Sequence, residues 1–151
     1  MDVEKIIREN IPNTVHLSLG TSENNVPWVC EVHFAVDEDL NIYWRSKTNR
    51  RHSLEIANNP IVAGNIVKQH EIGQPVVGVY FEGTAELLEN VDVNHPAYVS
   101  LNLNLGVDES SIEEAKKDDG HKFYKVTVQN WYAFGRFGAD HGQKLKLEWS
   151  S

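Results

Sequence analysis

Residues 42–60, I-Y-W-R-S-K-T-N-R-R-H-S-L-E-I-A-N-N-P, decide how the rest of the chain is interpreted. Their β-branched and aromatic start predicts a strand, and the segment S-L-E-I-A-N-N in front of Pro60 predicts a short helix. Between the two, residues 45–52 contain four of the 14 lysine and arginine residues of the chain and no acidic residue. The sequence therefore predicts a concentration of positive charge where a strand meets a helix.

This basic segment is a candidate site for an anion. The whole chain is acidic, with 22 aspartate and glutamate residues and a formal net charge of -8, so the positive charge is local. The first turn of a helix offers backbone N–H groups that lack partners within the helix, and hydroxyl and guanidinium groups beside them favour phosphate. A phosphate-bearing cofactor is therefore the first candidate ligand.

A simpler interpretation of the same residues is a solvent-exposed helix start. Arg51 and Glu55 are four residues apart, a spacing at which a surface ion pair forms on a helix. Thr48 belongs to a residue type that caps helices through its side chain. The rest of the chain has to decide between the two interpretations.

Composition argues against several classes of protein. An acidic chain is a poor match for nucleic acid or an anionic membrane surface, and no apolar run is long enough to span a bilayer. The length of 151 residues favours a single domain, residues 1–151, and the N-terminus lacks the layout of a signal peptide, so we expect a cytoplasmic protein. The one cysteine, Cys30, and the seven scattered histidines show no metal-ligand spacing, so no metal site is expected.

Most of the remaining chain shows the alternation of a β protein. A short helix is expected at residues 2–12, and strands at residues 13–21, 27–36, 42–44, 61–67, 76–88, 123–128 and 145–149. The first three strands follow one another through short turns, which predicts an antiparallel meander. Six or seven such strands predict a mainly β fold, a closed or half-closed antiparallel barrel with added helices.

Two features interrupt the alternation. Gly83, inside the strand at residues 76–88, predicts a bulge or a close approach of another backbone. Residues 93–119 have helical character, with Pro96 in a first helical turn, and we expect them to form a helical insert in the barrel.

The order of these elements, with the motifs in them, resembles the FMN-binding split-barrel family that is related to pyridoxamine 5'-phosphate oxidase. The resemblance covers residues 14–149. Besides residues 42–60, it is carried by T-V-H-L-S-L-G-T with V-P-W-V for a first hairpin, by Y-F-E-G-T-A-E-L-L, and by F-Y-K-V-T-V-Q-N. It implies a six- to seven-stranded antiparallel split barrel of the FMN-binding type.

The resemblance also implies which residues would hold the phosphate of FMN. That family binds the phosphate at the end of the third strand and the start of the helix that follows. Carried over to this chain, the phosphate contacts are assigned to Arg45, Ser46, Thr48, Arg51 and His52. Arginine would supply charge-assisted hydrogen bonds, and serine or threonine a hydroxyl.

The flavin ring and the partners follow from the same resemblance. The isoalloxazine would lie along residues 29–32, at the interface of a homodimer. An aromatic side chain of the partner, Trp131 or Phe137 in this numbering, would cover it. The remaining partner would be a small-molecule substrate bound in the cleft between the two subunits.

The chain departs from pyridoxamine 5'-phosphate oxidases at three places. Cys30 and Gly78 stand where those enzymes carry an arginine and a glutamine, and their arginine-rich C-terminal segment is replaced by G-A-D-H-G-Q-K-L-K-L-E-W. Vitamin B6 chemistry is therefore not expected. The expected function is an FMN-dependent oxidoreductase acting on a small molecule, with no catalytic residue assigned. The alternative is a non-catalytic module of the same fold that binds flavin or another small ligand, such as a deazaflavin or haem.

Overall fold

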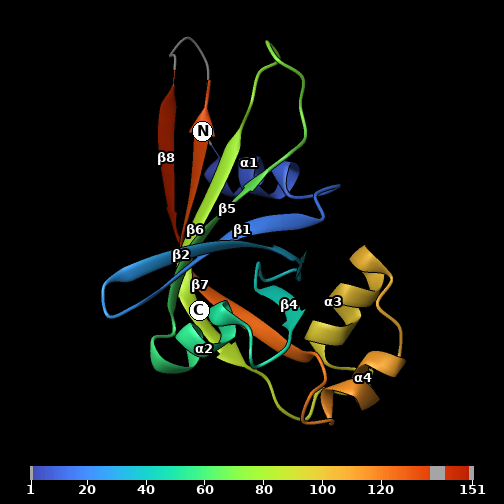
Figure 1. Ribbon diagram of the computed structural model, residues 1–151. Helices are drawn as coiled ribbons and strands as arrows, with labels where there is room; N and C mark the ends of the chain where they lie inside the picture. Colours follow the sequence, from blue (N-terminus) through green and yellow to red (C-terminus); the bar gives the residue numbers. More distant parts are fainter. Residues whose placement is uncertain (1, 137–141, 150–151) are drawn as a thin grey trace.

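A computed structural model describes residues 2–136 and 142–149 of the chain. Eight strands and four helices make up this part (Figure 1). The strands are β1 (His16–Glu23), β2 (Val26–His33), β3 (Ala35–Val36), β4 (Ile42–Ser46), β5 (Ile61–Val67), β6 (Gly78–Leu87), β7 (Lys122–Gly135) and β8 (Gln143–Glu148). The helices are α1 (Val3–Asn10), α2 (Arg51–Asn58), α3 (Pro96–Leu105) and α4 (Ser110–Ala115).

The strands form one antiparallel sheet that curls into a half-barrel. Their order is β2-β1-β5-β6-β7-β4-β3, and β8 pairs with β7 off this path. The 14 residues of β7 pair with β4 through their first half and with β8 through their second half. Strands β2 and β4, near the two ends of the sheet, contact each other and so bend it round. The prediction of a mainly β, antiparallel split barrel is confirmed.

The predicted meander of the first three strands is wrong. β1 and β2 form a hairpin, but β4 pairs with β7 and with the two-residue strand β3, not with β2. The expected strand at residues 27–36 is interrupted at Phe34, whose N–H bonds to the carbonyl of Val15. Asp37 then accepts the N–H groups of Asp39 and Asn41, both at 2.9 Å, which turns the chain into β4. This interruption also gives eight strands where six or seven were expected.

The bulge predicted at Gly83 is confirmed. The register between β6 and β7 shifts between Glu82 and Gly83, so that Gln129 of β7 has no opposite residue. A Cβ atom on Gly83 would lie 2.3 Å from the carbonyl oxygen of Thr127, closer than any side chain allows. Only glycine therefore fits where the two strands approach each other.

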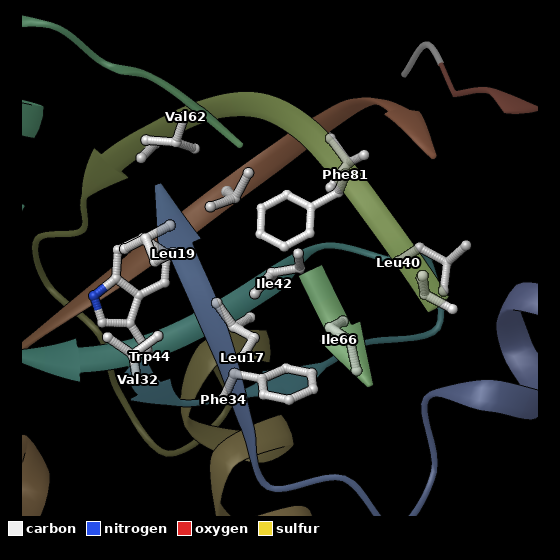
Figure 2. Packing of buried hydrophobic residues seen from close by; sticks show 14 of the residues in the cluster. Leu17, Leu19, Val32, Phe34, Leu40, Ile42, Trp44, Val62, Ile66 and Phe81 are labelled. Atoms are coloured by element: carbon white, nitrogen blue, oxygen red, sulfur yellow. The ribbon is translucent and has the colours of Figure 1, made fainter. Parts of the chain in front are cut away.

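The main hydrophobic core fills the inside of the half-barrel. Figure 2 shows side chains from β1, β4 and β6, among them Leu17, Leu19, Trp44 and Phe81, turned towards this common interior. Alternation along the strands produces this arrangement, because successive side chains point to opposite faces of a sheet. Trp44 stacks on Tyr124 of the neighbouring strand β7, with ring centroids 5.4 Å apart.

Two helices cover the barrel. Helix α1 packs against β7 and β8, and its Ile7 is fully buried in the main core. Helix α2 packs against β1, β2 and β6. Within residues 2–136 and 142–149, no helix is long and apolar enough to cross a membrane.

The helical insert predicted at residues 93–119 contains α3 and α4, which lie together beside β4 in Figure 1. Pro96 occupies the first turn of α3, as expected, and the side chain of His95 caps that helix by accepting the N–H of Ala97 at 3.0 Å. A second, smaller core joins the insert to the sheet through Tyr43, Leu101 and Phe123. The insert is thus packed on the side of β4 that faces away from the main core.

Candidate functional site

A cleft of about 670 Å³ opens where the end of β4, the start of α2, strand β2 and the helical insert meet. Its polar lining is mostly basic, and its apolar lining comes from the residue before β1, from β2 and from the insert. The residues that line it are Val15, Glu31, Val32, His33, Arg45, Ser46, Lys47, Arg50, His52, Leu101, Leu105, Val107 and His121. Three of the five residues assigned to phosphate from sequence, Arg45, Ser46 and His52, are brought together here.

The end of β4 divides this cleft into two sides. Trp44 belongs to the main core, whereas Tyr43 belongs to the core under the insert, so the two faces of β4 look in opposite directions. By the same alternation, Ser46 lies on the side of α2 and Arg45 on the side of the insert. The hydrogen bonds of both residues agree with this placement, since Ser46 bonds to His52 of α2 and Arg45 to Glu114 of α4.

On the α2 side, a serine and a histidine form a hydrogen-bonded pair. The hydroxyl of Ser46 lies 2.8 Å from Nε2 of His52. Burial lowers the pKa of His52, and the nearby positive charge of Arg50 lowers it further. The imidazole is therefore held neutral, and a bound anion would favour its protonated form.

Two cations complete this side of the cleft. Lys47 and Arg50 both line it, and within the described residues neither side chain forms an ion pair with a carboxylate. The turn that carries them is fixed by the hydroxyl of Ser53, which donates to the carbonyl of Lys47 at 2.8 Å. Two guanidinium or ammonium groups without partners, next to a hydroxyl and an imidazole, form a donor set suited to phosphate.

Thr48 does not reach the cleft. It lies in the turn before α2 and borders a different pocket with Asn49, Asp118 and Asp119. Nor does its side chain cap the helix, because the N-cap position is Arg50 and no side chain caps it. The two aspartates make this pocket a poor place for an anion.

Arg51 also points away from the cleft. Its Nε donates to Oε2 of Glu55 at 2.8 Å, which confirms the ion pair expected from their spacing, and its guanidinium lies 4.1 Å from the centre of the Trp28 ring. Glu55 is buried and also accepts the hydroxyl of Thr21 at 2.8 Å. The hydrogen bonds from Arg51 and Thr21, in that order, hold the pKa of Glu55 below its usual value. Arg51 therefore fastens α2 to β1 and β2.

On the insert side, Arg45 is already paired. Its Nη2 donates to Oε2 of Glu114, and its guanidinium lies 5.7 Å from the centre of the Phe123 ring. The other oxygen of Glu114 lies 3.0 Å from Nδ1 of His121. The hydrogen bond from His121, followed by the charge of Arg45, holds the pKa of Glu114 below its usual value. Nε of Arg45 is buried and finds no hydrogen-bond partner among residues 2–136 and 142–149.

Several residues of the cleft were not assigned from the sequence. Lys47 and Arg50 lie in the basic run itself. Two patterns could have distinguished them from Thr48 and Arg51: the alternation of side chains along β4 and the helical turn at the start of α2. His33 and His121 come from distant segments. For His121 the sequence offers no signal, because its partner Glu114 lies on another element.

The aromatic cover expected over a flavin is corrected in part. Trp131 is fully buried in the main core and cannot reach a ligand bound to another subunit. Trp131 is two residues from Ala133 on β7, and Ala133 pairs with Val79 on β6. Ala133 and Val79 belong to the main core, so Trp131 lies on the inner face of the sheet. Phe137, the other residue named for this role, lies outside the described residues.

The outer face of β2, β1 and β5 carries exposed apolar side chains. Val29, Gly20 and Ala63 stand side by side across the three strands. Val29 is 62% exposed, and Ile61, two residues from Ala63 on the same face, is 68% exposed. Glu31, next along β2 on this face, lines the cleft, so the outer face and the cleft share an edge.

The donor set and shape of the cleft fit a ligand with an anionic group and an apolar body. Ser46, Lys47, Arg50 and His52 gather at the α2 side, where they would contact a phosphate. The apolar part of the lining consists of Val15, Val32, Leu101, Leu105 and Val107. Mostly apolar walls with a few convergent polar groups are typical of cofactor sites. Among the described residues, no group of three or more histidine, cysteine, aspartate or glutamate side chains is arranged to hold a metal ion.

Comparisons with known proteins give likeness in structure alone. No family model matches the sequence, and no curated protein matches it. HutZ, the heme storage protein from Vibrio cholerae, superimposes with a TM-score of 0.72 at 18% identity, covering 93% of this chain and 100% of that one. A candidate pyridoxamine 5'-phosphate oxidase from Listeria innocua gives 0.65 at 16% identity, covering 87% and 98%.

A heme-binding protein from Mycobacterium smegmatis gives a TM-score of 0.70 at 17% identity and 89% coverage of this chain. The chain spans only about half of that protein, 53% of its length. At these identities the likeness concerns the fold and not the ligand. The chain therefore has the split-barrel fold shared by pyridoxamine 5'-phosphate oxidase-like and heme-binding proteins.

Proposed function

We propose that the protein binds FMN in the cleft between β4, α2 and the helical insert, and that it is a flavin-dependent oxidoreductase acting on a small molecule. One observation carries the proposal. Ser46, Lys47, Arg50 and His52 form a cationic, hydroxyl-bearing end of a cleft whose other wall is apolar. The fold adds support, because the split barrel is the fold of pyridoxamine 5'-phosphate oxidase-like proteins.

The phosphate of FMN would lie at the α2 side. Arg50 and Lys47 would give charge-assisted hydrogen bonds, and the hydroxyl of Ser46 and the imidazole of His52 would complete the contacts. Arg45 borders the same cleft, but Glu114 occupies its Nη2, so it contributes less to the phosphate than its place in the sequence suggests. The flavin would supply the redox chemistry, while the protein binds and orients it.

The protein would act as a homodimer joined through the outer face of β2, β1 and β5. Val29 and Ile61 expose apolar surface there, and Gly20 and Ala63 between them leave room for a close approach. Because Glu31 belongs both to this face and to the cleft, a partner seated on the face would border the ligand. The cleft of one chain is thus open on the side where a second chain would close it.

Comparing two ligands tests the proposal. Purified protein is titrated with FMN and with riboflavin, which lacks the phosphate, and quenching of flavin fluorescence is followed. We expect saturable quenching by both, with riboflavin at least tenfold weaker, since one charged hydrogen bond contributes about 1.5–3 kcal/mol. Equal affinity for the two ligands, or no saturable quenching, would contradict a phosphate site in the cleft.

Haem is the second candidate ligand, favoured by one specific observation. Of the three described histidines that line the cleft, His52 bonds to Ser46 and His121 to Glu114, whereas His33 has no hydrogen-bond partner there. An exposed imidazole of this kind is able to ligate iron. Two proteins with the same fold are described as binding or storing heme. Titration with hemin distinguishes the candidates: a sharp Soret band lost in His33→Ala but not in His16→Ala would favour haem.

A further inference from the structure

Three polar groups at the insert side of the cleft are linked in a chain. Arg45 of β4 donates to one oxygen of Glu114 in α4, and the other oxygen lies 3.0 Å from Nδ1 of His121. His121 lies between α4 and β7, and its ring is part of the cleft wall. The phosphate contacts proposed above use neither of these two hydrogen bonds.

This chain fixes which nitrogen of His121 carries the proton. The carboxylate of Glu114 accepts from both neighbours and has no proton to give, since its pKa lies below its usual value. Nδ1 of His121 is therefore the donor, and in the neutral imidazole Nε2 is left with its lone pair. With Nδ1 engaged, Nε2 is the nitrogen available to a ligand in the cleft.

The supports of this arrangement are rigid. A Cβ atom on Gly120, next to His121, would lie 1.9 Å from the carbonyl oxygen of Glu114, so the two segments meet at backbone distance. The ammonium group of Lys122 donates to the carbonyl of Ala115 at 2.7 Å on the other side of His121. Arg45 is held in turn over the ring of Phe123. A carboxylate that orients a histidine, itself held by a third group, is an arrangement that suits a histidine for general acid–base catalysis.

We propose that His121 is the general acid–base of the cleft, with Glu114 as the residue that orients it and Arg45 as the residue that positions Glu114. The inference rests on the proposed function and names its substrate class, a carbonyl or quinone compound with an apolar body. Leu101, Leu105 and Val107 of the insert line the same cleft and would contact that body.

The proton transfer balances the redox change. A reduced flavin bound in the cleft would supply a hydride, and one oxygen of the substrate would then carry negative charge. The Nε2–H bond of protonated His121 breaks and an O–H bond forms on that oxygen, which leaves a neutral imidazole that regains its proton from water. The substrate would gain one hydride, which carries both electrons, and one proton, and the flavin would lose that hydride and become oxidised.

The first test reads the proton position in the absence of any ligand. Full-length protein labelled with ¹⁵N at histidine is examined by NMR at a pH where the imidazoles are neutral. We expect His121 to carry its proton mainly on Nδ1, and expect Glu114→Gln to shift this tautomer balance. Glu113→Gln is the matched control, because Glu113 is exposed and pairs only with Lys116. A dominant Nε2–H form in the wild type would overturn the inference, as would an unchanged His121 signal in Glu114→Gln.

The second test measures turnover of the FMN-loaded protein with NADH and menadione. We expect His121→Gln to lower turnover by on the order of a hundredfold, the usual contribution of a general acid, with FMN affinity unchanged within about twofold. His70→Gln, at an exposed histidine that is not part of the cleft lining, is the control and should retain turnover. A solvent deuterium isotope effect should be present in the wild type and absent in His121→Gln.

Equal turnover of wild type and His121→Gln would overturn the inference, and so would wild-type turnover no faster than that of free FMN. Either result, together with saturable FMN binding, would leave the proposed cofactor site intact. Absence of FMN binding would instead contradict the proposed function itself and would overturn this inference with it.

Discussion

Arg50 and Arg51 are neighbours in the chain, yet their side chains have separate roles. Arg50 lines the cleft at the start of α2 and lies close enough to His52 to lower its pKa. Arg51 stacks on Trp28 and pairs with the buried Glu55, on the side of the helix that packs against β1 and β2. These two arginines therefore differ in place, since Arg50 faces the cleft and Arg51 holds α2 against the sheet.

The Arg51–Glu55–Thr21 network should make the stability of the protein depend on pH. The folded-state pKa of Glu55 is lowered, first by the Arg51 hydrogen bond and then by that of Thr21. The unfolded chain therefore binds this proton more readily, so the stabilisation is present above the ordinary pKa of about 4.5 and is lost as pH falls through the lower folded value.

Urea unfolding followed by tryptophan fluorescence measures this effect. We expect Glu55→Gln to have a lower free energy of unfolding than wild type at pH 7. The difference between the two free energies should be smaller at pH 4. Glu113→Gln, on an exposed helix position, should match wild type at both pH values. If the difference in free energy of unfolding between Glu55→Gln and wild type were the same at pH 7 and pH 4, this source of acid sensitivity would be ruled out.

The bulge at Gly83 should be intolerant of a side chain. A Cβ atom there would lie 2.3 Å from the carbonyl oxygen of Thr127 and 3.0 Å from Cα of Val128, and these backbone atoms cannot move without breaking the β6–β7 ladder. Overpacking of this kind costs about 1–3 kcal/mol. We expect Gly83→Ala to lower the free energy of unfolding by that amount, whereas Glu86→Ala, exposed on the same strand, should change it little. Equal stability of the two variants would contradict the register described for β6.

His52 should couple FMN binding to pH. Burial lowers the pKa of His52 in the ligand-free protein, and a bound phosphate would favour the imidazolium, so binding takes up a proton. FMN affinity should therefore rise as pH falls from 7.5 to 6. The phosphate of FMN also titrates near pH 6 and reduces this gain.

The variant His52→Gln separates the two effects, because an amide at the Nε2 position keeps a hydrogen bond to Ser46 but does not titrate. We expect the wild type to gain affinity relative to His52→Gln over this pH range, measured by flavin fluorescence. Parallel curves for the two proteins would show that His52 does not sense the phosphate.

The outer face of β2, β1 and β5 should be the dimer interface. Val29→Lys places a charge beside Gly20 and Ala63, where a partner would approach. We expect this variant to sediment as a monomer under conditions in which the wild type sediments as a dimer, and to bind FMN more weakly. Leu103→Lys is the matched control, since Leu103 is also an exposed apolar residue and lies on α3. A dimer that survives Val29→Lys and dissociates in Leu103→Lys would move the interface to the insert.

The fold could be predicted from the sequence to the level of its architecture. Alternation at Leu17 and Leu19, the bulge at Gly83 and the helical insert around Pro96 are local signals, and each is found where expected. The pairing of β4 with β7 is different. It depends on a break at Phe34 that no turn residue marks, and on contacts between strands about 80 positions apart.

The candidate site could be predicted only as a segment. Charge and position in the sequence single out residues 45–52, but which side chains face the cleft depends on the alternation of β4 and on the helical turn of α2. Thr48 and Arg51 belong to the same segment and face elsewhere. Arg45 has a partner that sequence could not supply, because Glu114 reaches it from the insert.

The central claim, that the phosphate of FMN is held where β4 meets α2, is tested most directly by the two neighbouring arginines. FMN is titrated into Arg50→Ala and Arg51→Ala, and flavin fluorescence is recorded with urea unfolding of the same samples. We predict that Arg50→Ala weakens FMN binding about ten- to a hundredfold at unchanged stability. Arg51→Ala should lower stability and leave affinity within about threefold of wild type while folded. Wild-type affinity in Arg50→Ala, or a selective loss of binding in Arg51→Ala at full stability, would contradict the account.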